Sequence, residues 1–473
     1  MNTSQKIPEL LDALPADLGK ETTPEGSMAE LLRSLAHRPV PTGRLVRLWT
    51  LGTLQAKIAA GYLAYWLKSG FAGEEEKERR KKQAHVDAAI KLLGGMGYLR
   101  GAIMKVGQAL AQYPKIVPEQ YVEVLGSLHF EAPPMHFSLL REFVRNELDS
   151  DPEELFDDFE AEAFAAASLG QVHRARLKSG EPVAVKVQYP NIARAIASDF
   201  KNMKALLAPL RGTRDWHNLI EQIEDVRTTL EIETDYTREI EFMERARSAL
   251  ASEDDIVIPC SYPALSSRRV LTMQYLEGVH LTEFLEGNPS QPQRDLHAAQ
   301  ITLLTFRLFY EGRMSYADPN PGNFIFMDDG RLGLIDFGCC RVFSEDEQEL
   351  MELGLAALLH GGDAQTQVIK KASLLSDEEA KDEKRREALG AVFDWFWEPL
   401  RHDGEFEFDD EYLRRGIELM SELISRRYVR SMPITIWNNR LFYGYRALMY
   451  RLRPRINVKR LHDSELQRAG LGG

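Results

Sequence analysis

The sequence predicts an α+β fold with two lobes. Between residues 151 and 277, short β-branched runs alternate with turn residues, a texture that indicates a small sheet. From Leu281 onward the apolar spacing is mainly helical, and only two short apolar runs, residues 323–326 and 332–335, interrupt it. This order fits a sheet-rich lobe followed by a helical lobe, with short β-loops between helices.

The composition is that of a globular protein. Of its 473 residues, 44% are apolar and 28% charged, which fits neither a disordered chain nor a bundle of membrane-spanning helices. The net charge of −13 argues against a protein that reads the phosphate backbone of nucleic acids. Only three cysteines occur, and two of them, Cys339 and Cys340, are adjacent, so neither a disulfide framework nor a cysteine metal site can be built. We therefore expect a cytoplasmic protein without a nucleic-acid partner.

Residues 1–83 are expected to form a lead-in and one amphipathic helix. The first residues, MNTSQKIPELLDALP, lack the apolar core of a secretory signal. The longest apolar segment, residues 49–67, has Lys57 near its centre, so we do not predict a transmembrane helix. Flanking cations at Arg44, Arg47 and Lys68 and several aromatic residues are typical of a helix at the inner surface of an anionic membrane. The alternative is a helix packed on the body of the protein.

Residues 84–150 are predicted to form a helical extension. Apolar residues step by four and three along one helical face: Leu92, Met96, Leu99, Ile103, Val106 and Leu110. Pro114, Pro118 and the segment 132–134 then break the pattern. The rest of the chain is expected to divide into the sheet-rich lobe at residues 151–277 and the helical lobe at residues 278–473.

Two short polar motifs in the helical lobe suggest a site for a metal ion and phosphate. Asp318 and Asn323 are five residues apart, as are the Asp and Asn of the kinase catalytic loop, and Asp336-Phe337-Gly338 follows the apolar run that ends at Ile335. A magnesium ion that bridges phosphates needs hard oxygen ligands such as those of Asn323 and Asp336. Either motif alone is weak evidence, but together they stand in the order found in kinases.

Phosphoryl transfer also needs a cation against the transferred charge. Lys186 lies in the alternating run Val183–Val187, on the face opposite Val185 and Val187. Its partner should be a carboxylate of the following helix, and residues 231–239 offer four. For Lys186 considered alone, the alternative is an exposed lysine on a strand.

The segment before the lysine strand has no G-x-G-x-x-G pattern. Its central residues are Ala165, Ala166, Ala167 and Ser168. Alanine restricts φ relative to glycine and adds methyl groups near the phosphates. We therefore expect a loop that still reaches phosphates through its backbone N–H groups but is less pliable than a glycine-rich one.

Over about residues 90–345 the chain resembles the UbiB/AarF-domain atypical kinases, a family that includes accessory proteins of coenzyme Q biosynthesis. Six motifs carry the resemblance, in the family's order: Lys105-Val106-Gly107-Gln108, Ala165–Ser168, Val185–Pro190, Glu233-Thr234-Asp235, Asp318–Asn323 and Asp336-Phe337-Gly338. The resemblance implies a two-lobed, protein-kinase-like fold with an N-terminal helical extension and a helical C-terminal region. It also implies ATP or ADP and Mg²⁺ as cofactors.

The resemblance further implies roles for single residues around the phosphates. Asp318 would be the catalytic-loop aspartate, acting as a base or orienting water, while Asn323 and Asp336 would hold magnesium. Glu239, six residues after Glu233, would pair with Lys186.

Other implied roles concern the surroundings of the nucleotide. The motif Lys105-Val106-Gly107-Gln108 would lie on a helix over the place where a protein kinase takes its peptide, which argues against peptide phosphorylation. Lys105 and Gln108 would face the nucleotide pocket, and Glu233 and Asp235 would meet that helix or the phosphates. Tyr275, at the end of a hinge-like strand, would lie at the nucleotide.

The chain departs from the family pattern at three positions. The family usually has His where Asn320 stands, and often His where Tyr316 stands. Gln274 replaces a commonly acidic residue at the hinge-like strand. No departure removes a metal ligand, but Asn320 affects the expected rate and substrate geometry.

The function expected from the sequence is that of a magnesium-dependent atypical kinase or ATPase at a membrane surface. The resemblance implies a link to isoprenoid or quinone-type lipids and a biosynthetic complex as a partner. One alternative is a pseudokinase scaffold that binds nucleotide without turnover, against which the intact residues Lys186, Asp318, Asn323 and Asp336 argue. Another is a soluble small-molecule kinase, which would lack the motif that begins at Lys105.

Overall fold

The computed structural model describes residues 135–471 apart from 168, 195, 198–199, 202–219, 221–223, 225–226, 229, 427 and 429–432. The chain divides into two compact units. One comprises His136–Ala165, Gly170–Gln188 and Ile232–Gly473, and it is described below; the other includes Ala166–Leu169 and Tyr189–Glu231. The helix expected at residues 49–67 and the motif containing Lys105, Gly107 and Gln108 lie outside the described residues.

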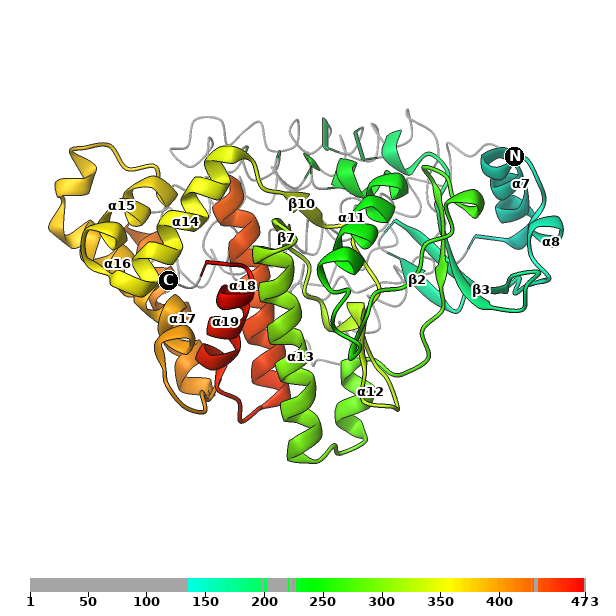
Figure 1. Cartoon of the computed structure of the whole chain (residues 1–473). Coiled ribbons are helices and arrows are strands. Elements are labelled where there is room, and N and C mark those ends of the chain that lie inside the picture. The colour runs from blue at the N-terminus through cyan, green and yellow to red at the C-terminus, as the bar shows by residue number, and fades with distance from the viewer. Residues whose placement is uncertain are drawn as a thin grey trace, which may run out of the picture. The chain divides into compact units, whose positions relative to one another are not determined.

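An antiparallel sheet forms the sheet-rich lobe (Figure 1). Along its main path, the strands lie in the order β1 (Asp158–Phe159), β3 (Gly170–Arg176), β4 (Pro182–Gln188) and β6 (Val270–Gln274). All residues of β4 after Pro182 are buried, as the valine-rich sequence of a central strand predicts. The register places Lys186 opposite Val172 of β3 and Leu271 of β6, so this charged side chain starts from the middle of the sheet.

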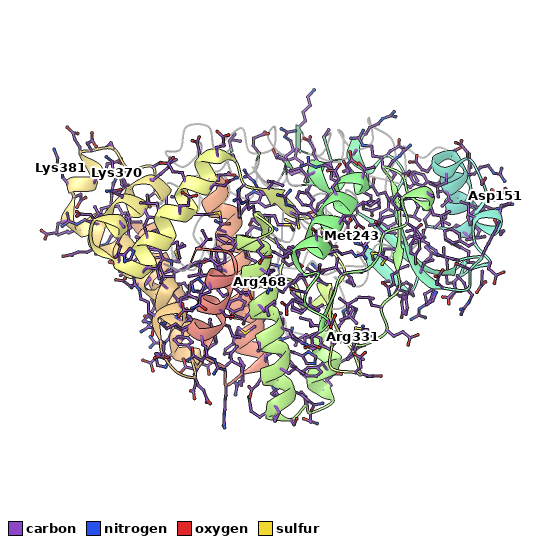
Figure 2. All side chains as sticks on the ribbon, in the orientation of Figure 1. Asp151, Met243, Arg331, Lys370, Lys381 and Arg468 are labelled. Atoms are coloured by element: carbon purple, nitrogen blue, oxygen red, sulfur yellow. The ribbon has the colours of Figure 1, made fainter. Side chains whose placement is uncertain are left out.

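Two helices precede this sheet and are tied together by one carboxylate. They are α7 (Phe137–Leu148) and α8 (Pro152–Leu155). Asp151, labelled in Figure 2, is buried between them. Its carboxylate accepts a hydrogen bond from Arg141 Nη2 at 2.7 Å and pairs with Arg145. These contacts fix the entry of the chain into β1.

Helix α11 (Tyr236–Ala249) packs against the sheet-rich lobe and begins at a side-chain cap. Asp235 Oδ1 accepts a hydrogen bond from the backbone N–H of Thr237 at 3.1 Å, which satisfies one of the free donors at the helix start. The buried residues of the helix include Glu239 and Met243, the latter labelled in Figure 2. The short elements β5 (Ile256–Val257) and η2 (Pro263–Leu265) connect α11 to β6.

The helical lobe begins with two helices and a series of short strands. They are α12 (Leu281–Glu286), α13 (Gln291–Tyr310), β7 (Met314–Tyr316), η3 (Pro321–Asn323), β8 (Phe324–Phe326), β9 (Leu332–Leu334) and β10 (Cys340–Val342). Strands β7 and β10 pair antiparallel, as do β8 and β9, and β5 pairs parallel with β9. These pairings hold the loops after β7 and β9 close together, and those loops carry the polar motifs.

Six further helices and a short 3₁₀ turn complete this lobe. They are α14 (Glu345–His360), α15 (Gly362–Ala372), η4 (Glu379–Lys381), α16 (Glu383–Arg401), α17 (Asp410–Ser425), α18 (Pro433–Leu452) and α19 (Val458–Arg468). Helices α18 and α19 lie along α13 (Figure 1). None of the described helices combines the length and the apolarity needed to cross a bilayer.

A buried ion-pair network joins α13 to α19. Arg307 is 1% exposed, so its charge must be met inside the protein. Its guanidinium donates to both carboxylate oxygens of Glu465, at 2.5 and 2.8 Å, and to Glu253 Oε1 at 2.9 Å. Arg468, labelled in Figure 2, extends the network to Glu311 at 2.7 Å. The last helix is thereby bound to the centre of the lobe.

The predicted α+β class with its two lobes is confirmed, and so are the strand at Val183–Val187 and the short strands near residues 324 and 332. The helix expected to carry the four carboxylates of residues 231–239 is interrupted within that segment. The chain leaves helical geometry at Thr234 and Asp235, because Asp235 caps a new helix. At Gly361, which has a φ of 63°, helix α14 ends and helix α15 begins.

Candidate active site

Lys186 is the centre of the polar cluster in the described structure. Its Nζ lies 2.6 Å from Glu239 Oε1 and 3.6 Å from Asp336 Oδ2. It also lies 3.4 Å from the carbonyl oxygen of Ile335. The Lys186 and Glu239 side chains are only 8% and 4% exposed, whereas that of Asp336 is 30% exposed. Asp336 is therefore the member of this cluster that a ligand from solvent reaches first.

The charge state of the cluster follows from one ammonium facing two carboxylates. Burial alone would lower the pKa of Lys186, but attraction by Asp336 and Glu239 outweighs it and raises that pKa above its usual value. Burial raises the pKa of Glu239, and the Asp336 charge adds to this increase while Lys186 opposes it. Lys186 thus remains a cation, as a group that faces phosphate must.

Backbone N–H groups orient the two carboxylates. Glu239 Oε1 accepts a second hydrogen bond, from the N–H of Phe337 at 3.3 Å, and Asp336 Oδ1 accepts one from Gly338 N at 2.9 Å. Phe337 itself is fully buried and anchors this segment. The geometry leaves Asp336 Oδ2 directed toward the Lys186 side of the cluster.

The catalytic-loop motif forms a compact turn after β7. Asn323 Nδ2 donates to the carbonyl oxygen of Asp318 at 2.9 Å and lies 3.4 Å from Asp318 Oδ2. Asn320 Oδ1 accepts from Gly322 N at 2.9 Å and so caps the short η3 turn. The residue that departs from the family's usual His thus has a local structural role here. Because Nδ2 of Asn323 is engaged with the loop, its Oδ1 is the atom suited to a cation.

Tyr316 is a site residue that sequence reasoning treated only as a departure from the family. Its hydroxyl oxygen accepts a hydrogen bond from Asn323 Nδ2 at 3.2 Å. Burial raises the pKa of Tyr316 well above its usual value, and the negative charges of Asp318 and Asp336 raise it further. Its position two residues before Asp318 was the feature of the sequence that could have indicated a role in the site. In the structure it ends a strand whose side chains are all buried.

The alanine-rich segment has strand geometry in part. Ala165, Ala166 and Ala167 form β2 (Ala165–Ala167), while Ser168 lies outside the described residues. The nearby Gly170 of β3 is a position that admits no side chain. A Cβ atom there would lie 2.1 Å from the carbonyl oxygen of Val187. Gly170, which follows the alanines, therefore allows β3 and β4 to approach each other closely.

Tyr275 lies at the end of β6, in the hinge-like segment. Its backbone N–H donates to the carbonyl oxygen of Pro182 at 3.1 Å, so this N–H group is already used within the protein. Its ring meets Phe164 edge-on at 5.8 Å, and its hydroxyl accepts from Arg174 at 3.2 Å. Any contact of Tyr275 with a nucleotide would therefore come from its carbonyl oxygen or its ring.

The two acidic residues of the Glu233-Thr234-Asp235 motif lie in different surroundings. A Cβ built on Gly338 would meet Glu233 Cγ at 3.5 Å, so Glu233 lies beside the segment that carries Asp336. Asp235 instead caps α11 and pairs with Arg268 at 3.2 Å. Of the two, Glu233 is the one near the polar cluster.

The residues present fit a magnesium ion that is completed by other ligands. In the described part of the chain, no group of three or more His, Cys, Asp and Glu side chains forms a ready metal site. Asp336 and Asn323 offer one carboxylate and one carboxamide oxygen. Magnesium is commonly held in this way, by one or two protein oxygens together with phosphate oxygens and water.

Comparisons with known proteins identify the family to which the chain is similar. The profile of the ABC1 atypical kinase-like domain matches residues 127–370. AarF domain-containing protein kinase 1 of Xenopus laevis is 34% identical over 281 residues, which cover 58% of this chain and 54% of the relative. The mitochondrial atypical kinase COQ8 of Saccharomyces cerevisiae is 28% identical over 334 residues, which cover 69% and 65%. The chain spans about half the length of the first of these relatives.

A solved structure extends the similarity to the fold. Rv3197 of Mycobacterium tuberculosis, solved in complex with erythromycin, superimposes with a TM-score of 0.57 at 25% sequence identity. The match covers 84% of this chain and 100% of that one. Since the family profile covers more than half of the chain and the fold is kinase-like, the protein belongs to the ABC1 atypical kinase-like family.

Proposed function

We infer that the protein is a magnesium-dependent nucleotide-binding enzyme that transfers the terminal phosphoryl group of ATP. The observation that carries this inference is the position of Lys186, which pairs with Glu239 at 2.6 Å and lies 3.6 Å from Asp336. In kinases this lysine binds phosphate oxygens while the D-F-G aspartate holds the metal. A buried lysine with two carboxylates also stays charged without a ligand. The cluster is thus prepared for an anion before one arrives.

The proposed roles follow from the contacts of each side chain. Lys186 binds phosphate oxygens, and Glu239 fixes the ammonium in place. Asn323 and Asp336 hold magnesium, which when bound neutralises the phosphate charge. Asp318 lies next to Asn323 and orients the attacking oxygen or accepts its proton. Ala165–Ser168 and Tyr275 contribute to the nucleotide site, where ATP binds and ADP remains after transfer.

We propose water as the first acceptor to test. The Lys105–Gln108 motif would, by the family resemblance, cover the place where a protein kinase takes a peptide. With water as the nucleophile, its oxygen attacks the γ-phosphorus and the bond to the β–γ bridging oxygen of ATP breaks. The products are ADP, inorganic phosphate and a proton, which Asp318 receives or directs to solvent.

A membrane surface and a lipid-related role complete the proposal. Supporting it are the resemblance to coenzyme Q accessory proteins and the similarity to the COQ8 atypical kinases. The cations around residues 49–67 would bind anionic lipid at the inner face of a membrane. Isoprenoid or quinone-type intermediates and a biosynthetic complex are the partners that this role requires.

The experiment that tests the proposal measures phosphate release from Mg²⁺-ATP by the purified full-length chain. Wild type is compared with Asp318→Asn, with and without liposomes that contain anionic phospholipid. Activity that rises with liposomes and falls at least tenfold in the variant supports a membrane-coupled ATPase. The double variant Arg44→Glu/Arg47→Glu tests binding to the membrane. If the helix is interfacial, reversal of these two charges should reduce the amount of protein that floats with anionic vesicles. Unchanged flotation would favour a helix packed on the protein.

The second candidate function is a nucleotide-binding scaffold without turnover. It would bind Mg²⁺-ATP with the same residues and leave phosphate release at the background rate under every condition. Phosphate release distinguishes the two, whereas calorimetry tests what they share, because Asp336→Asn should weaken Mg²⁺-dependent nucleotide binding in both cases. Binding that is unchanged by Asp336→Asn would contradict the metal assignment itself.

A further inference from the structure

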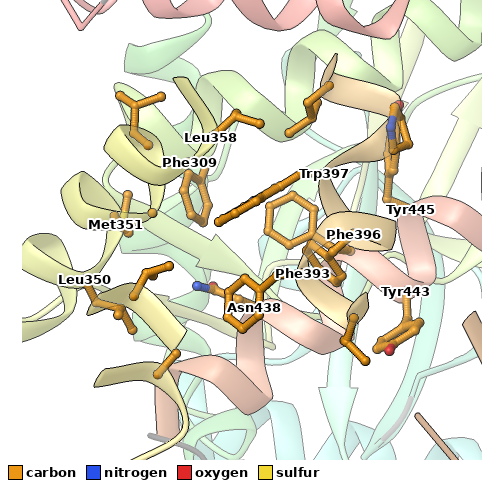
Figure 3. Close-up of a pocket in the computed structure, with 18 of the residues that line it drawn as sticks. Phe309, Leu350, Met351, Leu358, Phe393, Phe396, Trp397, Asn438, Tyr443 and Tyr445 are labelled. Atoms are coloured by element: carbon orange, nitrogen blue, oxygen red, sulfur yellow. The ribbon is translucent and has the colours of Figure 1, made fainter. Parts of the chain in front are cut away.

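An apolar pocket lies among the helices that follow the polar cluster in the chain. It has a volume of about 220 Å³, and its walls come from α13, α14, α15, α16, α17, α18 and α19 (Figure 3). None of the residues of the candidate active site belongs to its walls. The pocket is therefore a second cavity, separate from the proposed nucleotide site.

The walls of the pocket are mostly aromatic and aliphatic. Phe309 and Phe442 meet at 5.7 Å, Phe396 packs edge-on against Phe442 at 5.3 Å, and Phe393 packs against Trp397 at 5.2 Å. Native cores close such spaces with side chains, so a void of this size is unusual. An apolar cavity of about 150 Å³ is large enough to bind benzene. The space here accepts a somewhat larger molecule, of about ten non-hydrogen atoms.

The pocket offers no free charge. Arg446 is the one charged residue in its described walls. The guanidinium of Arg446 donates to Tyr412 Oη at 2.8 Å, to the Phe442 carbonyl oxygen at 3.0 Å and to the Phe396 carbonyl oxygen. These contacts use three of the five N–H donors and engage all three nitrogens of Arg446 with the protein, so its charge is committed to the fold rather than held out for an anionic ligand. The occupant should be neutral.

One polar group in the wall has unmet hydrogen-bonding capacity. Asn438 of α18 lines the pocket, and its Oδ1 is buried without a hydrogen-bond partner in the described part of the chain. Figure 3 shows the Asn438 side chain among the apolar side chains of the wall. A buried carboxamide oxygen without a hydrogen-bond partner destabilises the fold by about 1–3 kcal/mol, so a ligand that donates a hydrogen bond to it recovers that free energy. By contrast, the hydroxyl groups of Tyr310 and Tyr445 are bonded to His462 and Thr302.

We propose that this pocket binds a compact, neutral, largely apolar alcohol, with its hydroxyl group at Asn438. A hydroxyl group supplies the hydrogen-bond donor that Asn438 Oδ1 lacks. The aromatic residues Phe442, Tyr443 and Tyr445 of α18 then form part of a ligand-binding wall.

The test uses three small probes of one shape: 2-indanol, 2-indanone and indane. Binding to the full-length protein is measured by isothermal titration calorimetry and by ligand-observed NMR, with saturating Mg²⁺-ADP present. We expect 2-indanol to bind about tenfold more tightly than indane, the value of one good hydrogen bond. The ketone, which only accepts, cannot satisfy Oδ1 and should bind no more tightly than indane, so a ketone that binds as tightly as the alcohol would contradict the assignment to Oδ1. Equal affinity for the alcohol and the hydrocarbon, or no binding of 2-indanol, would overturn the proposal.

Two variants locate the site and keep the test independent of folding. Asn438→Leu should remove the preference for the alcohol while indane still binds. Gly354→Leu should fill the pocket, because a Cβ at Gly354 has only Val368 Cγ2 within 4 Å, at 3.9 Å. Gly390→Leu is its matched control, a helical glycine with open space around it that does not line the pocket. Binding of 2-indanol that survives Gly354→Leu would place it elsewhere and contradict the proposal.

This site is independent of the proposed enzymatic function. Lys186→Met should abolish nucleotide binding and leave the affinity for 2-indanol within about twofold of wild type, since Lys186 lies outside the pocket. Wild-type protein that binds 2-indanol but releases no phosphate from Mg²⁺-ATP would therefore contradict only the proposed function. The reverse result would contradict only the pocket.

Discussion

Tyr316 places its buried hydroxyl oxygen 3.2 Å from the carboxamide nitrogen of Asn323. This contact connects the end of β7 with the proposed metal ligand across the six residues between them. It holds the carboxamide in an orientation that leaves its oxygen for a cation. Groups behind a metal ligand commonly tune metal affinity in this way.

We predict that Tyr316→Phe weakens magnesium binding more than it weakens folding. Loss of the hydroxyl frees Asn323 to rotate, and Mg²⁺ affinity in the presence of nucleotide should fall about tenfold. A magnesium titration followed by calorimetry measures this change. Tyr450→Phe, which removes a surface hydrogen bond to Asp410, serves as the control. Equal magnesium affinities in wild type and Tyr316→Phe would show that Tyr316 only fills space.

The Lys186–Glu239 pair should show strong coupling in stability. Lys186→Met leaves Glu239 buried without its cation and should lower the free energy of unfolding by about 3 kcal/mol. In Lys186→Met/Glu239→Gln the loss should be smaller, because neither charge is left unpaired. Urea denaturation of the two single variants and the double variant gives the coupling energy. Additive effects would mean that the two side chains do not interact in solution.

Substitutions at the alanines before β3 and at Gly170, the first residue of β3, should affect different properties: nucleotide affinity in the first case and stability in the second. Ala166→Gly or Ala167→Gly should alter nucleotide affinity by loosening the loop, with little change in stability. Gly170→Ala should instead destabilise the fold by about 1–3 kcal/mol, because its Cβ would overlap the Val187 carbonyl oxygen. Calorimetry and thermal denaturation separate the two effects. Indifference of nucleotide affinity at both alanines would show that the phosphate loop lies elsewhere.

Stability should fall as the pH decreases from about 6.5 to about 4, and His462 should contribute to this loss. Burial lowers the pKa of His462 from 6.5 to about 4, so the unfolded chain binds a proton in this range that the folded protein excludes. The shift corresponds to roughly 3 kcal/mol of unfolding free energy that is present above pH 6.5 and lost toward pH 4. In Tyr310→Phe/His462→Phe, which removes both partners of one hydrogen bond, the pH dependence should be smaller.

The control for the pH experiment is His360→Gln, a change at an exposed histidine. Its pH profile of the free energy of unfolding, measured by urea denaturation, should follow that of wild type. A double variant with the same profile as wild type would contradict the assignment to His462.

The sequence was sufficient for features that depend on local pattern. The valine alternation around Lys186 predicts a central strand, and β4 is one. The spacing of Asp318 and Asn323 predicts a tight loop, and the backbone hydrogen bonds of that loop show it. Both patterns lie within a few residues, where side-chain period and turn chemistry decide the conformation.

Other features depend on contacts between distant segments. Spacing alone did not choose among the four carboxylates of residues 231–239, whereas the helix start at Asp235 puts Glu239 in the first turn, on the buried face. The partner of Tyr316 became clear only from the folded loop. The apolar pocket depends on side-chain volumes from seven helices, so the aromatic pattern of α18 was compatible with a filled core.

The bond between Arg307 and Glu465 also bears on the order in which the protein folds during synthesis. The two residues are 158 positions apart, and the catalytic loop lies between them in the sequence. Chains emerge from the ribosome with the N-terminal end first. Arg307, Asp318 and Asp336 are therefore made long before the carboxylate that meets the buried guanidinium. The lobe that carries these residues therefore reaches its final packing only after α19 has emerged from the ribosome.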